Sequence, residues 1–178
     1  GTFAFVFSMD AYFDDGVADL AGLHYVSTDI TVGSGGSRYD LLQGDVLFTL
    51  ESDETIGATT YADNDVHIFR PDTPGDYSPG TTTELLDGLS TYDTRAITLV
   101  EYDTWVGDVQ LYAGEFLYSD SFYAGELRHF APTGVGAGST TGTKTIFLSA
   151  TGAFNVTETF VGVDLVENSV QMGSRLLD

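Results

Sequence analysis

Short apolar runs that alternate with turn-forming residues constrain the fold of this chain more than any other feature of its sequence. Runs such as Val46–Leu50 hold only apolar and β-branched residues, and clusters of Gly, Asp, Ser and Thr separate one run from the next. Such runs, rich in Val, Thr and aromatic residues, are typical of antiparallel strands joined by turns. One short helical turn is expected, at Asp14–Gly22. The sequence therefore predicts an all-β fold.

Thirteen segments have the composition of a strand. They are Thr2–Met9, Leu23–Val26, Tyr39–Leu42, Asp45–Leu50, Val66–Arg70, Thr82–Leu86, Ile97–Tyr102, Val109–Tyr112, Glu115–Tyr118, Leu127–Phe130, Thr143–Leu148, Ala153–Val156 and Phe160–Val166. We therefore expect about eleven to thirteen strands in antiparallel meanders, packed as propeller-like blades or folded back into a β-sandwich.

Similar strands recur along the chain in the same order. Val46–Asp53 and Glu115–Asp120 each end in a hydroxyl residue and an acid, and Val66–Asp72 and Leu127–Thr133 each carry a proline after a phenylalanine. A repeated order of strands predicts a repeated structural unit. The expected organisation is one domain of residues 1–178 with three related units at about 1–44, 45–108 and 109–178.

The repeats carry a recognisable pattern of acids, phenylalanine and proline. The residues concerned are Asp63-Asn-Asp65-Val-His-Ile-Phe-Arg-Pro71, Leu85-Leu-Asp-Gly88, Leu127-Arg-His-Phe-Ala-Pro132 and Ser139-Thr-Thr-Gly-Thr143. They resemble a family of repeat-containing secreted or cell-surface bacterial proteins, most of them uncharacterised, over about residues 44–170. The family's usual Trp before the Asp-Gly strand is absent. The resemblance implies an extracellular β-repeat protein without catalytic residues.

The net charge limits the choice of partners. The chain has 27 acids and six basic residues, a formal charge of −21. Such a surface repels nucleic acid and anionic membranes, and favours cations, basic partners or solubility. No apolar run reaches the length of roughly 18 residues that a membrane span needs, so no membrane insertion is expected. The absence of cysteine excludes disulfides and zinc–thiolate sites.

Two candidate sites stand out among the polar residues. Asp63 and Asp65 alternate where a strand begins, and closely spaced carboxylates suit Ca²⁺, which takes oxygen ligands. Calcium is therefore the one cofactor expected, and a solvated turn is the alternative for these acids. Asn155-Val-Thr157 is a glycosylation sequon, so Asn155 is expected to carry a glycan if the protein is modified.

No sequence pattern of an enzyme is present. There is no Gly-x-Ser-x-Gly elbow and no EF-hand loop, and the excess of acids makes chance carboxylate pairs uninformative. No catalytic residue is therefore named. The expected function is that of an extracellular structural protein, a surface or filament subunit that self-associates through β-strand contacts, with Gly1–Asp10 as a candidate contact strand. The alternative is a carbohydrate- or ligand-binding β module, in which exposed aromatic residues stack on sugar rings.

Overall fold

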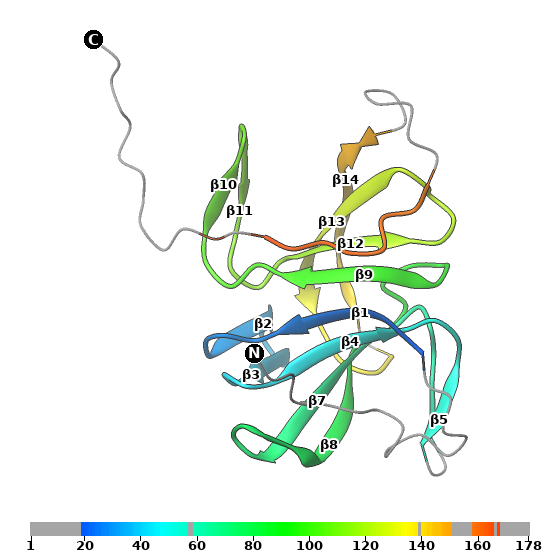
Figure 1. The fold of residues 1–178 in the computed structure, drawn as a ribbon. Coiled ribbons are helices and arrows are strands. Elements are labelled where there is room, and N and C mark those ends of the chain that lie inside the picture. The colour runs from blue at the N-terminus through cyan, green and yellow to red at the C-terminus, as the bar shows by residue number, and fades with distance from the viewer. Residues whose placement is uncertain (1–18, 57–58, 139, 151–157, 166, 168–178) are drawn as a thin grey trace, which may run out of the picture.

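The structure, a computed structural model, describes residues 19–56, 59–138, 140–150, 158–165 and 167, and it contains fourteen strands in these residues (Figure 1). The strands are β1 (Leu20–Tyr25), β2 (Ile30–Ser34), β3 (Ser37–Leu41), β4 (Val46–Leu50), β5 (Glu54–Ile56), β6 (Thr59–Tyr61), β7 (Val66–Thr73), β8 (Asp76–Leu86), β9 (Thr94–Leu99), β10 (Thr104–Val106), β11 (Val109–Leu111), β12 (Phe116–Asp120), β13 (Glu126–Gly134) and β14 (Thr141–Ser149). All strand pairs are antiparallel, which confirms the predicted all-β class.

Two four-stranded sheets form the body of the molecule. Their strand orders are β1-β4-β7-β8 and β9-β12-β13-β14, and three two-stranded hairpins, β2–β3, β5–β6 and β10–β11, project from their ends. Each sheet is a meander that begins with its innermost strand. We call residues 20–86 the first unit and residues 94–149 the second unit.

The two units are copies of one design, because their strands pair in the same register. Leu23 pairs with Phe48 in the first unit, as Ile97 pairs with Tyr118 in the second. The turn after the inner strand also repeats. The backbone amide of Val26 donates to the carbonyl of Asp45 at 2.9 Å, and that of Val100 donates to the carbonyl of Glu115 at 2.8 Å. The two sheets therefore share one pattern of strand pairing and of backbone hydrogen bonds.

A phenylalanine packed against a glycine also recurs in both copies. Phe69 and Phe130 lie on the third strand of their sheets, and each ring covers a glycine on the outermost strand. A Cβ added to Gly80 would come within 2.3 Å of the Phe69 ring, and one added to Gly142 within 2.5 Å of the Phe130 ring. Glycine is required at both positions because the ring occupies the space of a side chain.

The units follow one another like consecutive blades of a β-propeller. The inner strands β1 and β9 run side by side in the same direction (Figure 1), and a Cβ on Gly22 would lie 3.2 Å from the Cα atom of Ala96. Opposite faces of the two sheets meet. Leu47 of β4 lies in the core between the units, whereas its counterpart Leu117 of β12 faces away from the first unit. The second unit therefore presents one face to the first unit and packs residues of the 158–165 segment on its other face.

A third inner segment, residues 158–165 and 167, lies beside β9 as β9 lies beside β1. Val163 and Leu165 pack with Val100 and Leu117, in the arrangement in which Ile97 and Leu99 pack with Val26 and Leu47. The sequence predicts a strand at Phe160–Val166, but the described residues of this range belong to no sheet. Packing across the face of the second sheet satisfies their apolar pattern instead.

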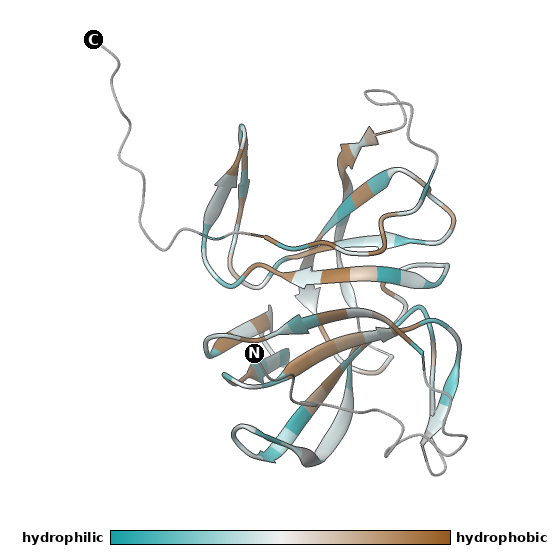
Figure 2. Ribbon diagram, viewed as in Figure 1, coloured by the Kyte–Doolittle hydropathy of each residue, from teal (hydrophilic) through white to brown (hydrophobic). Residues whose placement is uncertain are grey.

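The core between the units is apolar and continuous. It includes Leu47 and Ile68 of the first sheet, and Phe116 and Phe130 of the second, all fully buried. β4 is buried along its whole length because it carries a core on each face, and it stands out as an apolar strand in Figure 2.

Some predicted elements differ from the structure. The short helical turn expected at Asp14–Gly22 is wrong where it can be compared, because Leu20–Gly22 begins β1. The strands Thr2–Met9 and Ala153–Val156 lie outside the described residues. So do residues 1–18 of the first expected unit, and the division at about 1–44, 45–108 and 109–178 stays a prediction. The inner strands of the two described copies begin at Leu20 and Thr94.

Candidate functional site

The inner strands line an apolar groove along the axis around which the units are arranged. Corresponding positions of the three inner segments meet there. The lining residues are Leu20, Ala21, Gly22, Leu23, Ala96, Ile97, Val161, Gly162 and Val163. The groove has a volume of about 300 Å³. Leu23 is 55% exposed and Val161 is 77% exposed, so the groove is an apolar surface open to solvent.

Three carboxylates gather at the start of β7 and the end of β8. Oxygens of Asp65, Glu84 and Asp87 lie within 4.8 Å of one another. Asp65 is 7% exposed and accepts a hydrogen bond from the backbone amide of Gly88 at 2.7 Å. The oxygen Oε1 of Glu84 is buried without a hydrogen-bond partner among the described residues. The chain thus holds three acids together at one place in the first unit.

The carboxylates of the cluster repel one another. Burial raises the pKa of the Glu84 carboxyl above its usual value, and the nearby charges of Asp65 and Asp87 raise it further. Burial also raises the pKa of Asp65, although the amide of Gly88 opposes that change by stabilising the carboxylate. A bound cation would relieve this repulsion, and Asp65, Glu84 and Asp87 are the residues that would hold it.

The structure does not bring Asp63 and Asp65 into one cluster of acids. Asp65 belongs to the cluster, but Asp63 lies toward Asp53, Asp93 and Arg95. The backbone amide of Asp63 donates to the Asp53 carboxylate at 3.1 Å, so this turn is held by its own side chains. Two residues that are two positions apart point to the same side only within a regular strand. Asp63 and Asp65 lie in the turn before β7, so this rule does not hold for them.

A buried histidine lies next to the cluster. His67 of β7 is opposite Glu84 of β8 and has no exposed surface. Its Nε2 lies 3.2 Å from the carbonyl oxygen of Ala62, and its Nδ1 has no partner among the described residues. Burial lowers the pKa of His67 from 6.5 to about 4, so the ring is neutral at pH 7. A neutral ring that donates from Nε2 keeps a free lone pair on Nδ1.

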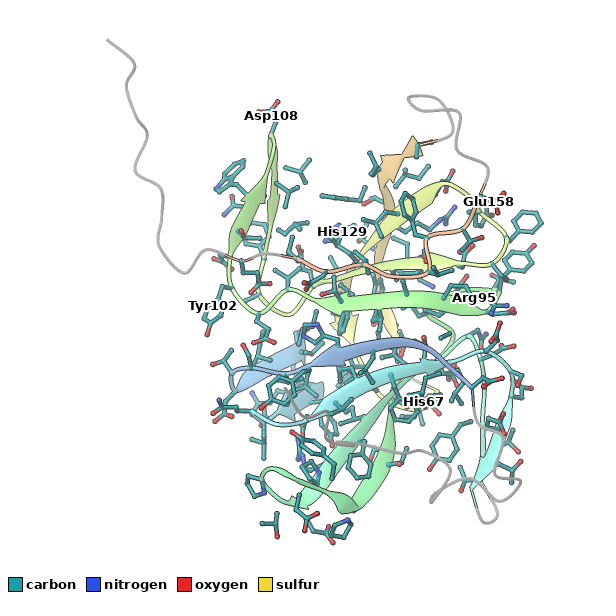
Figure 3. All side chains as sticks on the ribbon, viewed as in Figure 1. His67, Arg95, Tyr102, Asp108, His129 and Glu158 are labelled. Carbon is teal, nitrogen blue, oxygen red and sulfur yellow. The ribbon has the colours of Figure 1, made fainter. Side chains whose placement is uncertain are left out.

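The other two histidines form hydrogen bonds with two separate glutamates. His24 Nε2 lies 3.1 Å from Glu101 Oε1, across the contact between the units, and His129 Nε2 lies 2.9 Å from Glu115 Oε2. Burial lowers the pKa of His24, and the charge of Glu101 opposes that change. Figure 3 labels His67 and His129, which lie in different units. The three histidines therefore do not converge on one site.

Asn155, the predicted glycosylation site, lies outside the described residues. The sequence did not single out Glu84 and Asp87 as ligands. Both belong to the Thr83–Gly88 segment of the repeat pattern. In a meander this segment pairs with the strand that follows Asp65, and that pairing is the signal that could have placed Glu84 and Asp87 near Asp65.

The chain matches no family model, no curated protein and no solved structure. Within the described part of the chain, no helix is long and apolar enough to cross a membrane.

Proposed function

We propose that the chain is a non-enzymatic structural protein of the bacterial cell surface, a subunit that self-associates through contacts between its β units. One observation carries the proposal. The packing of β1 against β9, which joins the two units, recurs where the third inner segment packs beside β9. A contact that joins one face of a unit to the opposite face of the next can be repeated, so further units or copies can be added.

The polar part of this contact repeats along with the apolar part. The backbone amide of Ser27 donates to the carboxylate of Glu101 at 2.8 Å. The backbone amide of Glu101 in turn donates to the carboxylate of Glu167 at 2.7 Å. Because both bonds join matching positions of consecutive units, the same geometry can add a further unit.

A second copy of the chain is the partner that fits this contact. The apolar groove along the axis is open, with Leu23 and Val161 exposed, and blades in a closed propeller would cover such inner residues. In such an assembly the trailing face of one copy would meet the leading face of the next. A contact of this kind gives a closed ring if the rotation between units closes, and a filament if it does not.

Hairpin β10–β11 supports this direction of growth. The matching hairpin β2–β3 reaches from the first unit to the second, where Ser34 Oγ donates to the carbonyl of Thr133 and the amide of Val135 donates to the carbonyl of Ser37. Hairpin β10–β11 projects from the second unit, with Asp108 at its tip (Figure 3) and Trp105 64% exposed. It is placed to reach a following unit in the same way.

Sedimentation velocity and negative-stain microscopy of the full chain test the proposal. The wild type is expected to form dimers or longer assemblies, and more of them at high salt, because salt screens the repulsion between acidic copies. The variant Leu23→Lys with Val161→Lys places charges in the groove at exposed positions and is expected to stay monomeric. Ile146→Lys, at a 56% exposed position on the outermost strand β14, is the matched control and should assemble normally.

A monomeric wild type at all salt concentrations would refute the proposal. Assembly that Ile146→Lys abolishes and the groove variant leaves intact would show that the sheet edge, and not the contact between units, joins the copies.

A further inference from the structure

Three exposed aromatic side chains form a cluster at one end of the second unit. Tyr92 lies in the connection from β8 to β9, and Phe122 and Tyr123 lie in the turn from β12 to β13. The rings of Tyr92 and Phe122 stack with centroids 4.3 Å apart and planes 7° from parallel, and Tyr123 stands edge-on to both. Phe122 is 59% exposed. We call Tyr92, Phe122 and Tyr123 the aromatic platform.

A buried acid holds the platform in place. Asp120 is almost fully buried at the end of β12, and its carboxylate accepts hydrogen bonds from the backbone amides of Phe122 and Tyr123 at 3.2 and 2.8 Å. The hydroxyl of Ser90 donates to the same carboxylate at 2.9 Å and accepts from the backbone amide of Tyr92 at 3.2 Å. One Asp–Ser pair therefore fixes the backbone of all three aromatic residues.

The repeat fold does not need this arrangement, and the first unit shows why. Leu50 occupies in β4 the place that Asp120 occupies in β12, since each residue ends the strand opposite the start of the inner strand. Hairpin β5–β6 follows Leu50 in place of the aromatic turn. A buried carboxylate costs desolvation, and an exposed phenylalanine gains nothing from burial. Features that cost stability and are absent from the sister copy point to a binding role.

The groups around the platform favour a neutral, hydroxylated ligand. Arg128 lies over the Tyr123 ring, 3.6 Å from its centroid, and bonds Glu126 at 2.8 Å. Arg95 bonds Glu51 and Asp93 at 2.6 and 2.8 Å. Figure 3 shows Arg95 and Glu158 at this end of the molecule. The acids here outnumber the two arginines, so the surface repels an anionic ligand, and the paired groups offer planar donors and acceptors to hydroxyl groups.

We propose that the aromatic platform binds a neutral polysaccharide. Exposed aromatic faces pack on the apolar C–H faces of sugar rings, and neighbouring guanidinium and carboxylate groups bond the hydroxyls at the rim. The platform is an open surface, so it suits an extended chain of sugars. None of the three platform residues lines the groove along the axis, so variants of the platform and of the groove can be tested separately.

Affinity electrophoresis in native gels tests the site. The probes are soluble mixed-linkage β-glucan, galactomannan, amylopectin and xylan, with alginate as an anionic and polylysine as a cationic comparison. At least one neutral polysaccharide is expected to retard the wild type, and Phe122→Ala and Tyr92→Ala should weaken retardation at least tenfold. Tyr112→Ala removes an exposed aromatic residue elsewhere on the surface and should bind as the wild type does.

Ser90→Ala separates positioning from contact. This variant keeps all three rings but removes the hydroxyl that links Tyr92 to Asp120, and it is expected to bind more weakly while the circular dichroism spectrum stays unchanged. Three results would overturn the proposal: no retardation by any neutral probe, equal retardation of the wild type and Phe122→Ala, or binding to polylysine alone. Sedimentation of Phe122→Ala should match that of the wild type, so failure here leaves the self-association proposal standing.

Discussion

Glu101 and Glu167 occupy the same position in consecutive inner segments and accept the same kind of hydrogen bond from the segment before. Glu101 receives the backbone amide of Ser27, and Glu167 receives the backbone amide of Glu101 itself. Glu101 is thus both an acceptor toward the first unit and a donor toward the third inner segment. The carboxylates tie neighbouring inner strands that share no ladder of backbone hydrogen bonds.

Replacing Glu101 by alanine should destabilise the protein strongly. The carboxylate is almost fully buried and bonds the Ser27 amide and His24 Nε2, so its loss leaves buried donors without an acceptor. A loss of about 2–4 kcal/mol in the free energy of unfolding is expected in urea denaturation. Glu51→Ala removes an exposed partner of Arg95 and should cost at most about 1 kcal/mol. Equal losses for the two variants would contradict this prediction.

The paired glycines should not tolerate a methyl group. Gly80→Ala and Gly142→Ala would force Cβ atoms into the rings of Phe69 and Phe130, and overpacking of this kind costs about 1–3 kcal/mol or more. Thermal unfolding followed by circular dichroism measures the effect. Gly36→Ala is the control, since a Cβ there meets nothing within 4 Å. Similar melting temperatures for Gly80→Ala and Gly36→Ala would show that the ring moves away at no cost.

His67 should make the protein sensitive to mild acid. Its pKa is about 4 in the folded protein and 6.5 in the unfolded chain, so the unfolded state binds the proton more readily between these values. The contribution of His67 to stability is full above pH 6.5 and falls as the pH decreases toward 4, by about 3 kcal/mol in all. His67→Gln keeps a donor for Ala62 and should lack this part of the decline in urea denaturation measured from pH 7 to pH 4.

The carboxylates beside His67 act in the opposite direction. The raised pKa values of Asp65 and Glu84 favour the folded state as the pH falls through them, so only the difference between the wild type and His67→Gln isolates the histidine. His129→Gln, at a half-buried position in the second unit, serves as the control. If stability depends on pH in the same way in His67→Gln as in the wild type, burial does not lower the pKa of His67 as expected.

Calcium should raise the melting temperature, and the acid cluster should be responsible. The expected gain is several degrees in saturating Ca²⁺, reversed by EGTA, because a cation relieves the repulsion among Asp65, Glu84 and Asp87. Glu84→Gln should lose most of this response and melt higher than the wild type without the metal. Asp63→Asn, outside the cluster, should keep the response. A melting temperature that ignores Ca²⁺ and EGTA would remove calcium from consideration.

The sequence predicts the central strands well because each of them is apolar on a face that must be buried. The match of Val46–Asp53 with Glu115–Asp120, and of Val66–Asp72 with Leu127–Thr133, corresponds to β4 with β12 and β7 with β13. The strands missing from the prediction, β2, β5, β6 and β10, belong to short two-stranded hairpins. Half of their residues are Thr, Gly or Ser, so their apolar runs are too short to stand out in the sequence.

The candidate sites were harder to predict because they depend on contacts between distant segments. Glu84 and Asp65 lie nineteen positions apart, and only the meander of β7 and β8 brings them together. Tyr92 and Phe122 come from different connections and meet because Asp120 and Ser90 share a hydrogen bond. The sequence shows that Ile97–Glu101 resembles Val163–Glu167. This similarity alone does not reveal whether such a segment is the first or the last strand of its unit.

Asp120 and Leu50 show what a second copy of the same unit makes available to evolution. One ends β12 as a buried acid, the other ends β4 as a buried hydrocarbon, and the surrounding register is the same. Each copy can carry its own residue at this position, because the strand pairing around it is the same with an acid as with a hydrocarbon. Diversification of such a protein is therefore expected to concentrate in the connections of one copy at a time, while the inner strands that join the copies change slowly.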